Sequence, residues 1–394
     1  MIRTTIVPIG EPIDAIDMHG VRRDAFIPFA IRCPQFCELG DGTLIFIFEA
    51  KYNSQLDEEP ACHVLLRSHD GGITWGEARL LCYDDVNLFG VPIYDRINDT
   101  LIYFARSREW KPDFVQDRLL TEQDQVDGKV LERFWVTKSS DGGLTWQDYR
   151  EVFLPAPEEW RVKHCPTPGM GIQLMHQADP SKNGRIIIPA NHIGANLGGK
   201  NDFGSHLIFS DDFGETWNLG AVQDYVGGNE CIATELLDGT LLLNCRSQAA
   251  IPPNRRIQSE SRDGGTSFRQ NYPVESLYDP CCHGGFTSTL VKGKETVFFT
   301  VPTGETGDPF NCLGVPGYWG RREKLMLYAS LDKGRSYSPI HLMSPAGEFA
   351  AYSSLLATKS GNLLAAWESG PEIGLYRSIE YTIFREDELA SLLF

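Results

Sequence analysis

Arginine side chains stand beside several strand-like runs of this sequence. Arg32 comes just before one such run, Arg246 ends another, and Arg322 begins a third. A guanidinium group binds a carboxylate through two parallel hydrogen bonds, which lysine does not offer. The chain carries a formal net charge of −17, so an anionic ligand would be repelled except where arginines gather. The alternative for Arg32 is a place on the solvated surface.

Cysteine spacing argues against a metal site. The chain has ten cysteines, of which Cys33 and Cys37 are separated by three residues and Cys281 and Cys282 are adjacent. Neither spacing is that of a zinc site, and the sequence contains no His-Glu-x-x-His. We therefore interpret the cysteines as reduced thiols that are mostly buried.

A short pattern of turn residues recurs five times in the chain. It reads Ser-x-Asp-x-Gly-x-Thr/Ser-aromatic. In such a pattern the Ser and Asp side chains bond to nearby backbone amides, the glycine adopts a backbone conformation closed to other residues, and the aromatic ring packs beneath the turn. Each copy follows a strand-like run, so the pattern predicts a hairpin turn. The copies are Ser68–Trp75, Ser139–Trp146, Ser210–Trp217, Ser261–Phe268 and Ser330–Tyr337.

Short β-type segments lie between the copies, and long helical periodicity is missing from the sequence. The aspartates of successive copies are 51 to 71 residues apart, which leaves room for six four-stranded blades in 394 residues. Many short strands with regular turns indicate an all-β fold, and the repeat favours a propeller. We predict a single domain over residues 1–394, a six-bladed β-propeller. Predicted strands include residues 42–48, 185–189, 239–244 and 361–367, and a short terminal helix is expected at 386–393.

Charge and hydropathy argue against two classes of partner. A chain with 53 acidic and 36 basic residues repels nucleic acid and anionic lipid. Nothing in the sequence approaches the roughly 18 apolar residues of a membrane span, so we expect no membrane insertion. Residues 1–8 lack the apolar run of a secretory signal, which predicts a cytoplasmic protein.

The recurring turn resembles the Asp-box, or BNR repeat, of sialidases and of several other β-propellers, some of them non-catalytic. Further segments are similar to the sialidase family (glycoside hydrolase family 33-like), and the likeness extends over residues 25–385. Ile31–Pro34 resembles the family's Arg-Ile-Pro signature, with Cys33 in place of Ile. Asn229–Arg246 is similar to its Asn-Glu…Glu-Leu-x-Asp-Gly…Asn-x-Arg segment. Ala351–Leu355, followed by Trp367-Glu368, resembles its Ala-Tyr-Ser-x-Leu…Tyr-Glu ending.

The resemblance implies which groups react. Tyr352 would be the nucleophile and Asp57 the acid/base residue that protonates the leaving oxygen. Glu230 would take the proton of the tyrosine, and Glu235 in the same segment is the alternative base. The alternative for Asp57 is that residues 57–59 form only a solvated acidic loop.

The resemblance also implies a substrate-binding set. Arg32, Arg246 and Arg322 would hold a sugar carboxylate, with Arg321 as the alternative to Arg322. This expectation is consistent with the need for a local cluster of arginines in an acidic chain.

Two further carboxylates and one replacement complete the predicted site. Glu368 would orient an arginine, which we expect to be Arg32, and Glu49 would contact a substrate hydroxyl. Lys51 stands where sialidases have an arginine, so contacts in that corner are expected to differ.

Sialic acid carries a carboxylate on its anomeric carbon, which makes tyrosine a suitable nucleophile. An Asp or Glu nucleophile about 4 Å from that carboxylate would be repelled by about 4 kcal/mol at an effective dielectric constant near 20, whereas a neutral phenol is not. The resemblance therefore implies a retaining exo-glycosidase that removes terminal α-linked sialic acids from glycoconjugates and needs neither a metal nor an organic cofactor. The alternatives are the same mechanism on Kdn or another keto-acid sugar, and a non-catalytic glycan-binding propeller.

One segment departs from the family pattern. Residues 279–285, Asp-Pro-Cys-Cys-His-Gly-Gly, stand where sialidases usually have a Cys-Gln-Gly-Ser type run, with His283 and Gly285 as the replacements. Substrate preference near this loop is therefore left open.

Overall fold

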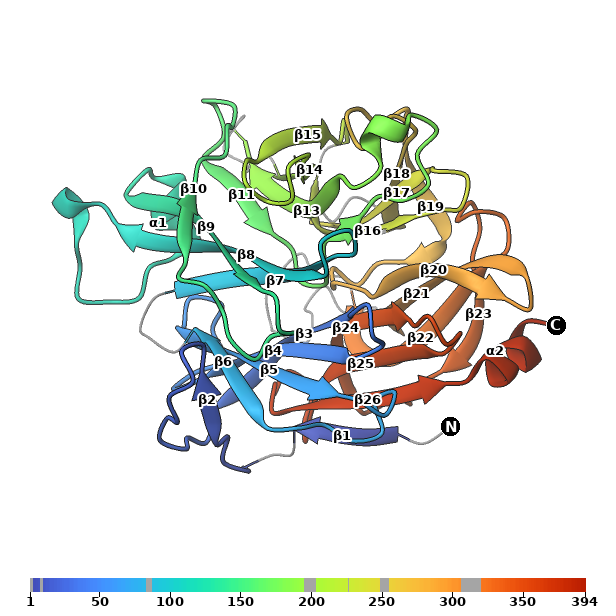
Figure 1. Cartoon of the computed structure of the whole chain (residues 1–394), viewed down its shortest axis with the longest axis horizontal. Coiled ribbons are helices and arrows are strands. Elements are labelled where there is room, and N and C mark those ends of the chain that lie inside the picture. Colours follow the sequence, from blue (N-terminus) through green and yellow to red (C-terminus); the bar gives the residue numbers. More distant parts are fainter. Residues whose placement is uncertain are drawn as a thin grey trace.

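Six small sheets surround a central axis (Figure 1). The computed structural model describes residues 3–7, 10–82, 87–194, 203–225, 227–248, 255–305 and 320–394. Within these ranges each sheet has four or five strands, and the first full-length strand of each sheet lies nearest the axis. The predicted six-bladed β-propeller is confirmed.

The first three blades follow one another along the chain, and the strands of each are named from the axis outward. Blade 1 consists of β3 (Ala30–Glu38), β4 (Leu44–Lys51), β5 (Ala61–Ser68), β6 (Ala78–Cys82) and β2 (Ala15–Asp17). Blade 2 consists of β7 (Asn87–Asp95), β8 (Thr100–Trp110), β9 (Val130–Ser139) and β10 (Arg150–Val152). Blade 3 consists of β11 (Val162–Pro166), β12 (Ile172–Gln173), β13 (Ile186–Ile193), β14 (Phe203–Ser210) and β15 (Asn218–Val222).

The other three blades complete the ring. Blade 4 consists of β16 (Gly228–Glu235), β17 (Leu241–Ser247), β18 (Arg255–Ser261) and β19 (Gln270–Tyr278). Blade 5 consists of β20 (Phe286–Val291), β21 (Lys294–Glu305), β22 (Gly320–Ser330) and β23 (Ser338–Leu342). Blade 6 consists of β24 (Phe349–Ala357), β25 (Leu363–Gly370), β26 (Ser378–Phe384) and, from the other end of the chain, β1 (Arg3–Val7).

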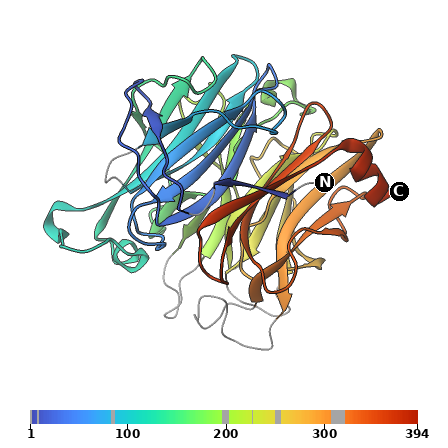
Figure 2. The same cartoon turned by 90° about the horizontal axis from the view of Figure 1, so that it is seen from below.

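Strand β1 closes the ring. It pairs antiparallel with β26, with Arg3 opposite Thr382, and the two termini lie on the same side of the molecule (Figures 1 and 2). An antiparallel edge strand taken from the opposite end of the chain joins the first and last blades through backbone hydrogen bonds.

The hydrophobic core consists of separate clusters between neighbouring blades. Phe46 of blade 1 packs in one cluster with Leu364 of blade 6, and Ile102 of blade 2 packs with Ile188 of blade 3. Corresponding clusters join the remaining neighbours. Because every sheet is covered on both faces by its neighbours, the strands read as nearly continuous apolar runs.

The five Asp-boxes form the predicted hairpin turns. In the first, Asp70 accepts hydrogen bonds from the backbone N of Thr74 at 2.9 Å and from its Oγ1 at 2.6 Å. These bonds lower the pKa of Asp70 to about 2, and the N–H of Gly72 donates to Ser68 Oγ at 2.9 Å. The same aspartate contacts recur in the other four boxes, at residues 141, 212, 263 and 332.

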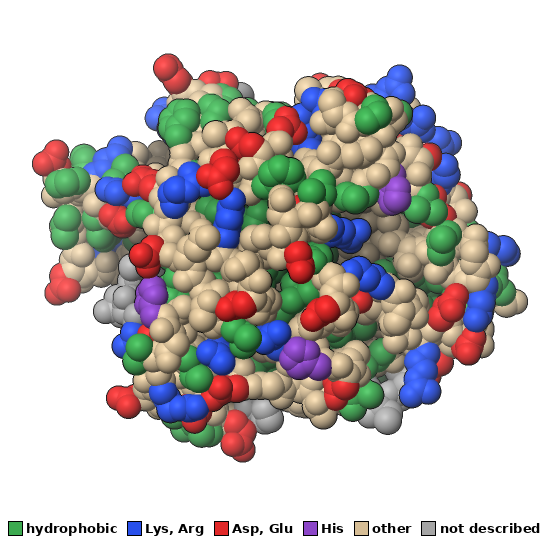
Figure 3. Space-filling view, viewed as in Figure 1, with side chains coloured by type: hydrophobic (Ala, Val, Ile, Leu, Met, Phe, Trp, Pro, Cys, Tyr) green, Lys and Arg blue, Asp and Glu red, His purple; other side chains and the backbone are tan. Residues whose placement is uncertain are grey.

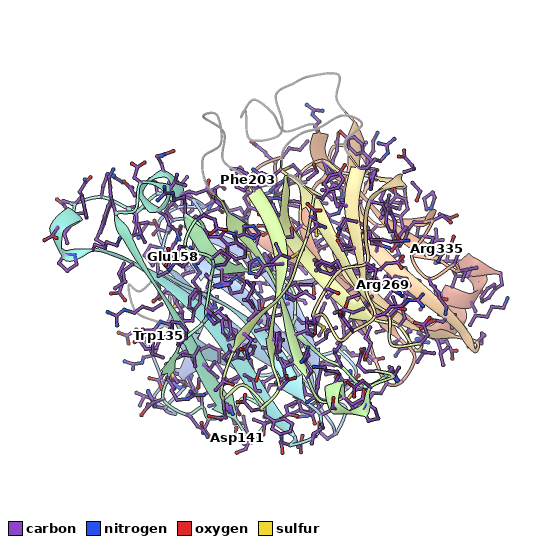
Figure 4. The ribbon with its side chains drawn as sticks, turned by 90° about the horizontal axis from the view of Figure 1, so that it is seen from above. Trp135, Asp141, Glu158, Phe203, Arg269 and Arg335 are labelled. Carbon is purple, nitrogen blue, oxygen red and sulfur yellow. The ribbon has the colours of Figure 1, made fainter. Side chains whose placement is uncertain are left out.

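Every box joins the third and fourth strands of its blade, so all five turns lie on one face of the propeller. The start of each first strand and the end of each second strand therefore lie on the opposite face. Figure 4 shows this arrangement, with Asp141 of a box turn and Phe203, at the start of a third strand, at opposite edges of the disc. Blade 6 takes its fourth strand from β1 and has no turn at that point.

Helices are short and peripheral. The predicted terminal helix is confirmed as α2 (Glu386–Leu393), and α1 (Glu122–Val126) extends from blade 2. Two short 3₁₀ turns cover Pro112–Phe114 and Pro180–Lys182. Within the described ranges, no helix has the length and apolar character needed to cross a membrane.

The surface carries charges of both signs (Figure 3), and the cysteines agree with the expectation of reduced, mostly buried thiols. On the face shown in Figure 3, acidic and basic side chains are interspersed rather than gathered by sign. Eight of the ten cysteines lie in the described ranges as free thiols, and all of these are buried except Cys165, which is half-buried.

Candidate active site

Register shifts in three innermost strands coincide with three of the predicted residues. A β-bulge adds a residue to one strand of a pair and re-aims the neighbouring side chains. In this propeller the bulges carry Arg32 on β3, Glu230 on β16 and Tyr352 on β24, and all three side chains line one pocket. The shifted segments are residues 32–35, 228–231 and 350–353.

Tyr352 is the centre of this pocket. Its hydroxyl donates a hydrogen bond to Glu230 Oε1 at 2.7 Å and accepts one from Arg246 Nη1 at 2.5 Å. The same Arg246 nitrogen donates to Glu230 Oε2 at 2.6 Å. The phenol is buried, and desolvation raises its pKa well above the ordinary value, although Arg246 acts in the opposite direction. The phenol is therefore neutral in the free protein, with a carboxylate placed to receive its proton.

Three guanidinium groups surround the Tyr352 ring. The Cζ atoms of Arg322, Arg32 and Arg246 lie 5.2, 5.4 and 6.0 Å from the ring centroid. All three side chains are buried, each with less than a tenth of its surface exposed. The predicted cluster of arginines therefore exists beside the predicted nucleophile, in a protein whose net charge is strongly negative.

Glu368 lies behind Arg32, as predicted. Its Oε1 accepts from Arg32 Nε at 2.8 Å and from the backbone N of Cys33 at 2.9 Å, and its Oε2 accepts from the backbone N of Tyr352 at 3.1 Å. Complete burial raises the pKa of Glu368, while Arg32 opposes this shift. One buried carboxylate thus fixes the positions of the first arginine and of the strand that carries the tyrosine.

Asp57 lies at the mouth of the pocket, on the loop after β4. Its Oδ1 accepts a hydrogen bond from Arg32 Nη1 at 3.0 Å, and its side chain exposes 84% of its surface. Desolvation by the pocket walls raises the pKa of Asp57, but the charges of Arg32 and Lys51 outweigh it, so this pKa lies below its ordinary value.

Lys51 anchors the loop that carries Asp57. Its buried ammonium donates to the carbonyl of Leu56 at 2.8 Å and to that of Glu59 at 3.1 Å. The residue that replaces the family arginine therefore fixes both sides of the acid/base candidate. Glu49 also lines the pocket, with Oε2 3.9 Å from Lys51 Nζ.

The structure separates the two arginine candidates of β22. Arg322 is buried and donates to Tyr376 Oη at 2.6 Å and to the carbonyl of Cys281 at 3.1 Å. The Arg321 side chain is 55% exposed and lies 3.9 Å from Glu323. Adjacent residues of a strand point to opposite faces, so only Arg322 belongs to the cluster.

Glu235 lies at the far end of β16, on the Asp-box side of the propeller. Its carboxylate accepts from the backbone N of Met175 at 2.7 Å, the backbone N of His176 at 3.0 Å and Gln177 Nε2 at 2.6 Å. These bonds hold a loop of blade 3 and commit Glu235 to a structural role. Glu230 is the carboxylate beside Tyr352.

Two contacts of the arginines were not predicted from the sequence. Gln248 Oε1 accepts from Arg246 Nη2 at 2.9 Å, and Tyr376 stacks against Arg32, with 4.0 Å between Cζ and the ring centroid. The two-residue period of a strand that contains Arg246 could have indicated Gln248. Tyr376 follows β25 in a loop without periodicity, so the sequence offered no signal for it.

The pocket is a cavity of about 200 Å³ that extends from the arginine cluster over blades 2 and 3. Its far wall combines charged and apolar side chains, among them Arg106, Arg108, Glu122, Val162 and Ile193. In the part of the chain that the structure describes, no group of three or more His, Cys, Asp or Glu side chains could hold a metal ion. The arrangement offers a neutral phenol, two carboxylates and a cationic wall, which suits nucleophilic and acid-base chemistry on an anionic ligand.

Curated proteins of similar sequence are sialidases. The sialidase of Micromonospora viridifaciens is 28% identical over 378 residues, which are 93% of this chain and 54% of that protein. Sialidase-4 of Mus musculus is 26% identical over 239 residues, 56% of this chain and 45% of that protein. The chain spans about half the length of these two relatives.

Solved structures of similar fold include a sialidase and a trans-sialidase. Trypanosoma rangeli sialidase in complex with the inhibitor DANA matches 98% of this chain and 60% of its own, with a TM-score of 0.73 and 17% identity. The intramolecular trans-sialidase from Ruminococcus gnavus in complex with oseltamivir carboxylate matches 91% of this chain and 95% of its own, with a TM-score of 0.67 and 18% identity. These likenesses support the six-bladed fold.

A family model described as a BNR repeat-like domain matches residues 42–365. The matched range includes all five Asp-boxes and runs from blade 1 into blade 6. Because this match covers most of the chain, the protein belongs to the family of BNR repeat-like domains, and the curated proteins that it resembles are sialidases.

Proposed function

We propose that this protein is a retaining exo-sialidase, which hydrolyses terminal α-linked sialic acids with Tyr352 as its nucleophile. The observation that carries the proposal is the hydroxyl of Tyr352, held between Glu230 Oε1 at 2.7 Å and Arg246 Nη1 at 2.5 Å. Glu230 takes the phenol proton as the oxygen attacks the anomeric carbon, and Arg246 stabilises the charge that develops on that oxygen.

The arginine cluster binds the carboxylate of the substrate. Arg32, Arg246 and Arg322 supply planar donors around the point of attack, and burial strengthens their interaction with an anion. Since the substrate carboxylate is attached to the reacting carbon, the same three residues place that carbon against Tyr352.

Substrate binding prepares Asp57 to act as an acid. In the free protein Asp57 Oδ1 accepts a hydrogen bond from Arg32 Nη1 at 3.0 Å, and the Arg32 charge lowers the pKa of Asp57. A substrate carboxylate that binds Arg32 neutralises this charge and competes for the same donor, so the pKa of Asp57 rises and the carboxyl takes up a proton. Asp57 then protonates the leaving oxygen, and afterwards it activates the water that releases the sugar from Tyr352.

The relatives support this chemistry. The curated proteins of similar sequence are sialidases. Trypanosoma rangeli sialidase has been solved with sialic acid, with 2,3-difluorosialic acid as a covalent intermediate, and with 2,3-difluoro-KDN. Both sialic acid and Kdn therefore belong in the test.

Tyr352→Phe tests the nucleophile. We expect kcat on 4-methylumbelliferyl sialoside to fall at least about a thousandfold, because the attacking oxygen is lost. The fold should persist, since the ion pair of Arg246 and Glu230 at 2.6 Å does not depend on the hydroxyl. Release of the fluorophore gives kcat for both proteins. In the wild-type reaction, proton NMR of the first sugar product should show the α-anomer, as retention requires.

Tyr381→Phe is the matched control. Its buried hydroxyl donates to the carbonyl of Gly72 at 2.8 Å, on the Asp-box side of the propeller. This variant also loses one buried phenol hydroxyl, yet kcat should be retained. Activity of Tyr352→Phe equal to that of Tyr381→Phe would rule out the nucleophile. A wild-type protein that binds the sialoside and the Kdn analogue but releases neither fluorophore would be a glycan-binding propeller instead.

A further inference from the structure

The turn Asp279–Cys282, part of the segment that departs from the sialidase pattern, lies behind the arginine cluster. Asp279 is buried, and its Oδ1 accepts from the backbone N of Cys281 at 2.9 Å and from that of Cys282 at 3.4 Å. Its Oδ2 accepts from the backbone N of Ser247. One carboxylate therefore joins this turn to the end of β17, directly after Arg246.

A fully buried guanidinium supports the same turn. Arg256 donates to the carbonyl of Cys282 at 2.8 Å, and its Nη1 lies 3.5 Å from Asp279 Oδ1. Its Nε donates to Asn244 Oδ1 at 2.8 Å on the neighbouring strand. Both charged side chains of this ion pair are completely excluded from solvent, so the turn cannot shift without leaving a charge unpaired in the interior.

Cys281 connects the turn to two arginines of the cluster. Its carbonyl accepts from Arg322 Nη2 at 3.1 Å. Its thiol donates to Gln248 Oε1 at 3.2 Å, and that oxygen also accepts from Arg246 Nη2 at 2.9 Å. The backbone of Cys281 is left-handed, with φ of 58°. This conformation directs the carbonyl toward Arg322, and it is one that β-branched residues rarely adopt.

We propose that the turn Asp279–Cys282 is a positioning device that fixes the separation of Arg246 and Arg322, and thereby sets the affinity of the pocket for a substrate carboxylate. The inference rests on the proposed function, because it assumes that these arginines bind that carboxylate. Asp279 and Cys281 act through the arginines and are positioning residues. Arg32 has a separate support in Glu368, so the turn controls only two of the three guanidinium groups.

A pair of substitutions at Cys281 separates backbone geometry from the thiol. Glycine adopts a left-handed backbone freely, whereas valine is driven out of it. Cys281→Val should move the carbonyl away from Arg322 and raise KM for the sialoside about tenfold or more, with a smaller effect on kcat, because the carboxylate is bound in both the ground and the transition state. Cys281→Gly lacks the thiol but keeps the turn, and its KM should stay within about threefold of wild type.

Lys292→Val is the matched control for backbone strain. Lys292 also has a left-handed backbone, with φ of 48°, in the exposed β20–β21 turn, away from the pocket. This variant should lower the thermal unfolding temperature but leave KM unchanged. Unfolding of each variant is measured alongside its kinetics, so that a folding defect is not mistaken for a binding defect.

Asp279→Asn provides a second test. The asparagine side chain lacks the negative charge that faces Arg256. Its NH₂ group is a donor, whereas the backbone N of Ser247 needs an acceptor at that position. We expect KM to rise and the affinity for DANA, measured by calorimetry, to fall in parallel, with kcat less affected. If Cys281→Val and Cys281→Gly changed KM equally, or if neither they nor Asp279→Asn changed it, the positioning role would be refuted. An inactive wild-type protein would instead refute the proposed function.

Discussion

A phenol attacks as a nucleophile only when a base removes its proton, and the two glutamates of β16 differ in this respect. Glu230 accepts a hydrogen bond directly from the Tyr352 hydroxyl. Both carboxylate oxygens of Glu235 instead accept hydrogen bonds from backbone and side-chain amides of blade 3. Five positions separate the two residues, and this places them near opposite faces of the propeller. At the residue scale, the catalytic proposal depends on this difference.

Glu230→Gln should therefore lower kcat at least about a hundredfold, because an amide cannot take the phenol proton at neutral pH. Glu235→Gln makes the same change of charge and size at the other end of the strand, and it should lower stability while kcat is retained. Steady-state kinetics with the fluorogenic sialoside, together with thermal unfolding of both variants, measure this contrast. The reverse order of the two effects would assign the base to Glu235.

Blade 3 illustrates how neighbouring strands assemble a polar core element. His164 on β11, His206 on β14 and His192 on β13 form one buried chain of hydrogen bonds. His164 Nε2 must donate to the carbonyl of Pro155 at 3.1 Å, because a carbonyl only accepts. When the rings are neutral, His206 Nε2 donates to His164 Nδ1 at 2.9 Å, and His192 Nδ1 donates to His206 Nδ1 at 3.0 Å. With all three rings neutral each contact between two rings holds one proton, whereas two charged rings would place two protons in one contact.

The histidine chain predicts acid sensitivity of the fold. Burial lowers the pKa of His164 to about 3, that of His192 to about 4, and that of His206 well below the ordinary value. Unfolded histidine binds a proton below about pH 6.5. Stability should therefore be independent of these groups above that pH and fall below it, by up to about 2 kcal/mol for each histidine at pH 5.

Urea unfolding between pH 7.5 and pH 5 measures this effect. His206→Gln should be less stable at pH 7.5, and its stability should fall less steeply toward pH 5 than that of wild type. His176→Gln, at an exposed position, should reproduce the wild-type slope. Equal slopes for all three proteins would mean that the buried histidines do not cause the acid sensitivity.

The ring of the whole molecule is closed by one short strand. β1 contributes the backbone hydrogen bonds to β26, and Glu380 on β26 accepts from Arg3 Nε at 2.9 Å and from Thr5 Oγ1 at 3.0 Å. Of its five residues, only Val7 is buried. Its contribution therefore comes mostly from pairing and ring closure rather than from the core.

Deletion of residues 1–7 should lower the unfolding temperature by about 5 °C and leave the edge of β26 open to association with other chains. Tyr352 and Glu368 lie on the two strands of blade 6 nearer the axis, so kcat at 20 °C should be largely retained. Differential scanning calorimetry and light scattering follow the two effects. An unchanged unfolding temperature would mean that the ring does not need this closure.

The sequence alone predicted the fold and most of the residues of the candidate site. Asp-box turns use only local bonds between a side chain and the backbone within eight residues, so their number and spacing could be read directly. The resemblance to sialidases predicted Tyr352 and the three arginines, and the structure places the three guanidinium groups around the Tyr352 ring.

Only the tertiary structure decided which neighbours complete the site. The choice of Glu230 over Glu235 follows from the face of the propeller on which each end of β16 lies, and the bulges that aim Arg32 and Tyr352 arise from register between strands, which local sequence does not encode. The supports at Asp279 and Tyr376 join segments far apart in the chain. Such contacts become visible only when the six blades close around one axis and bring those segments together.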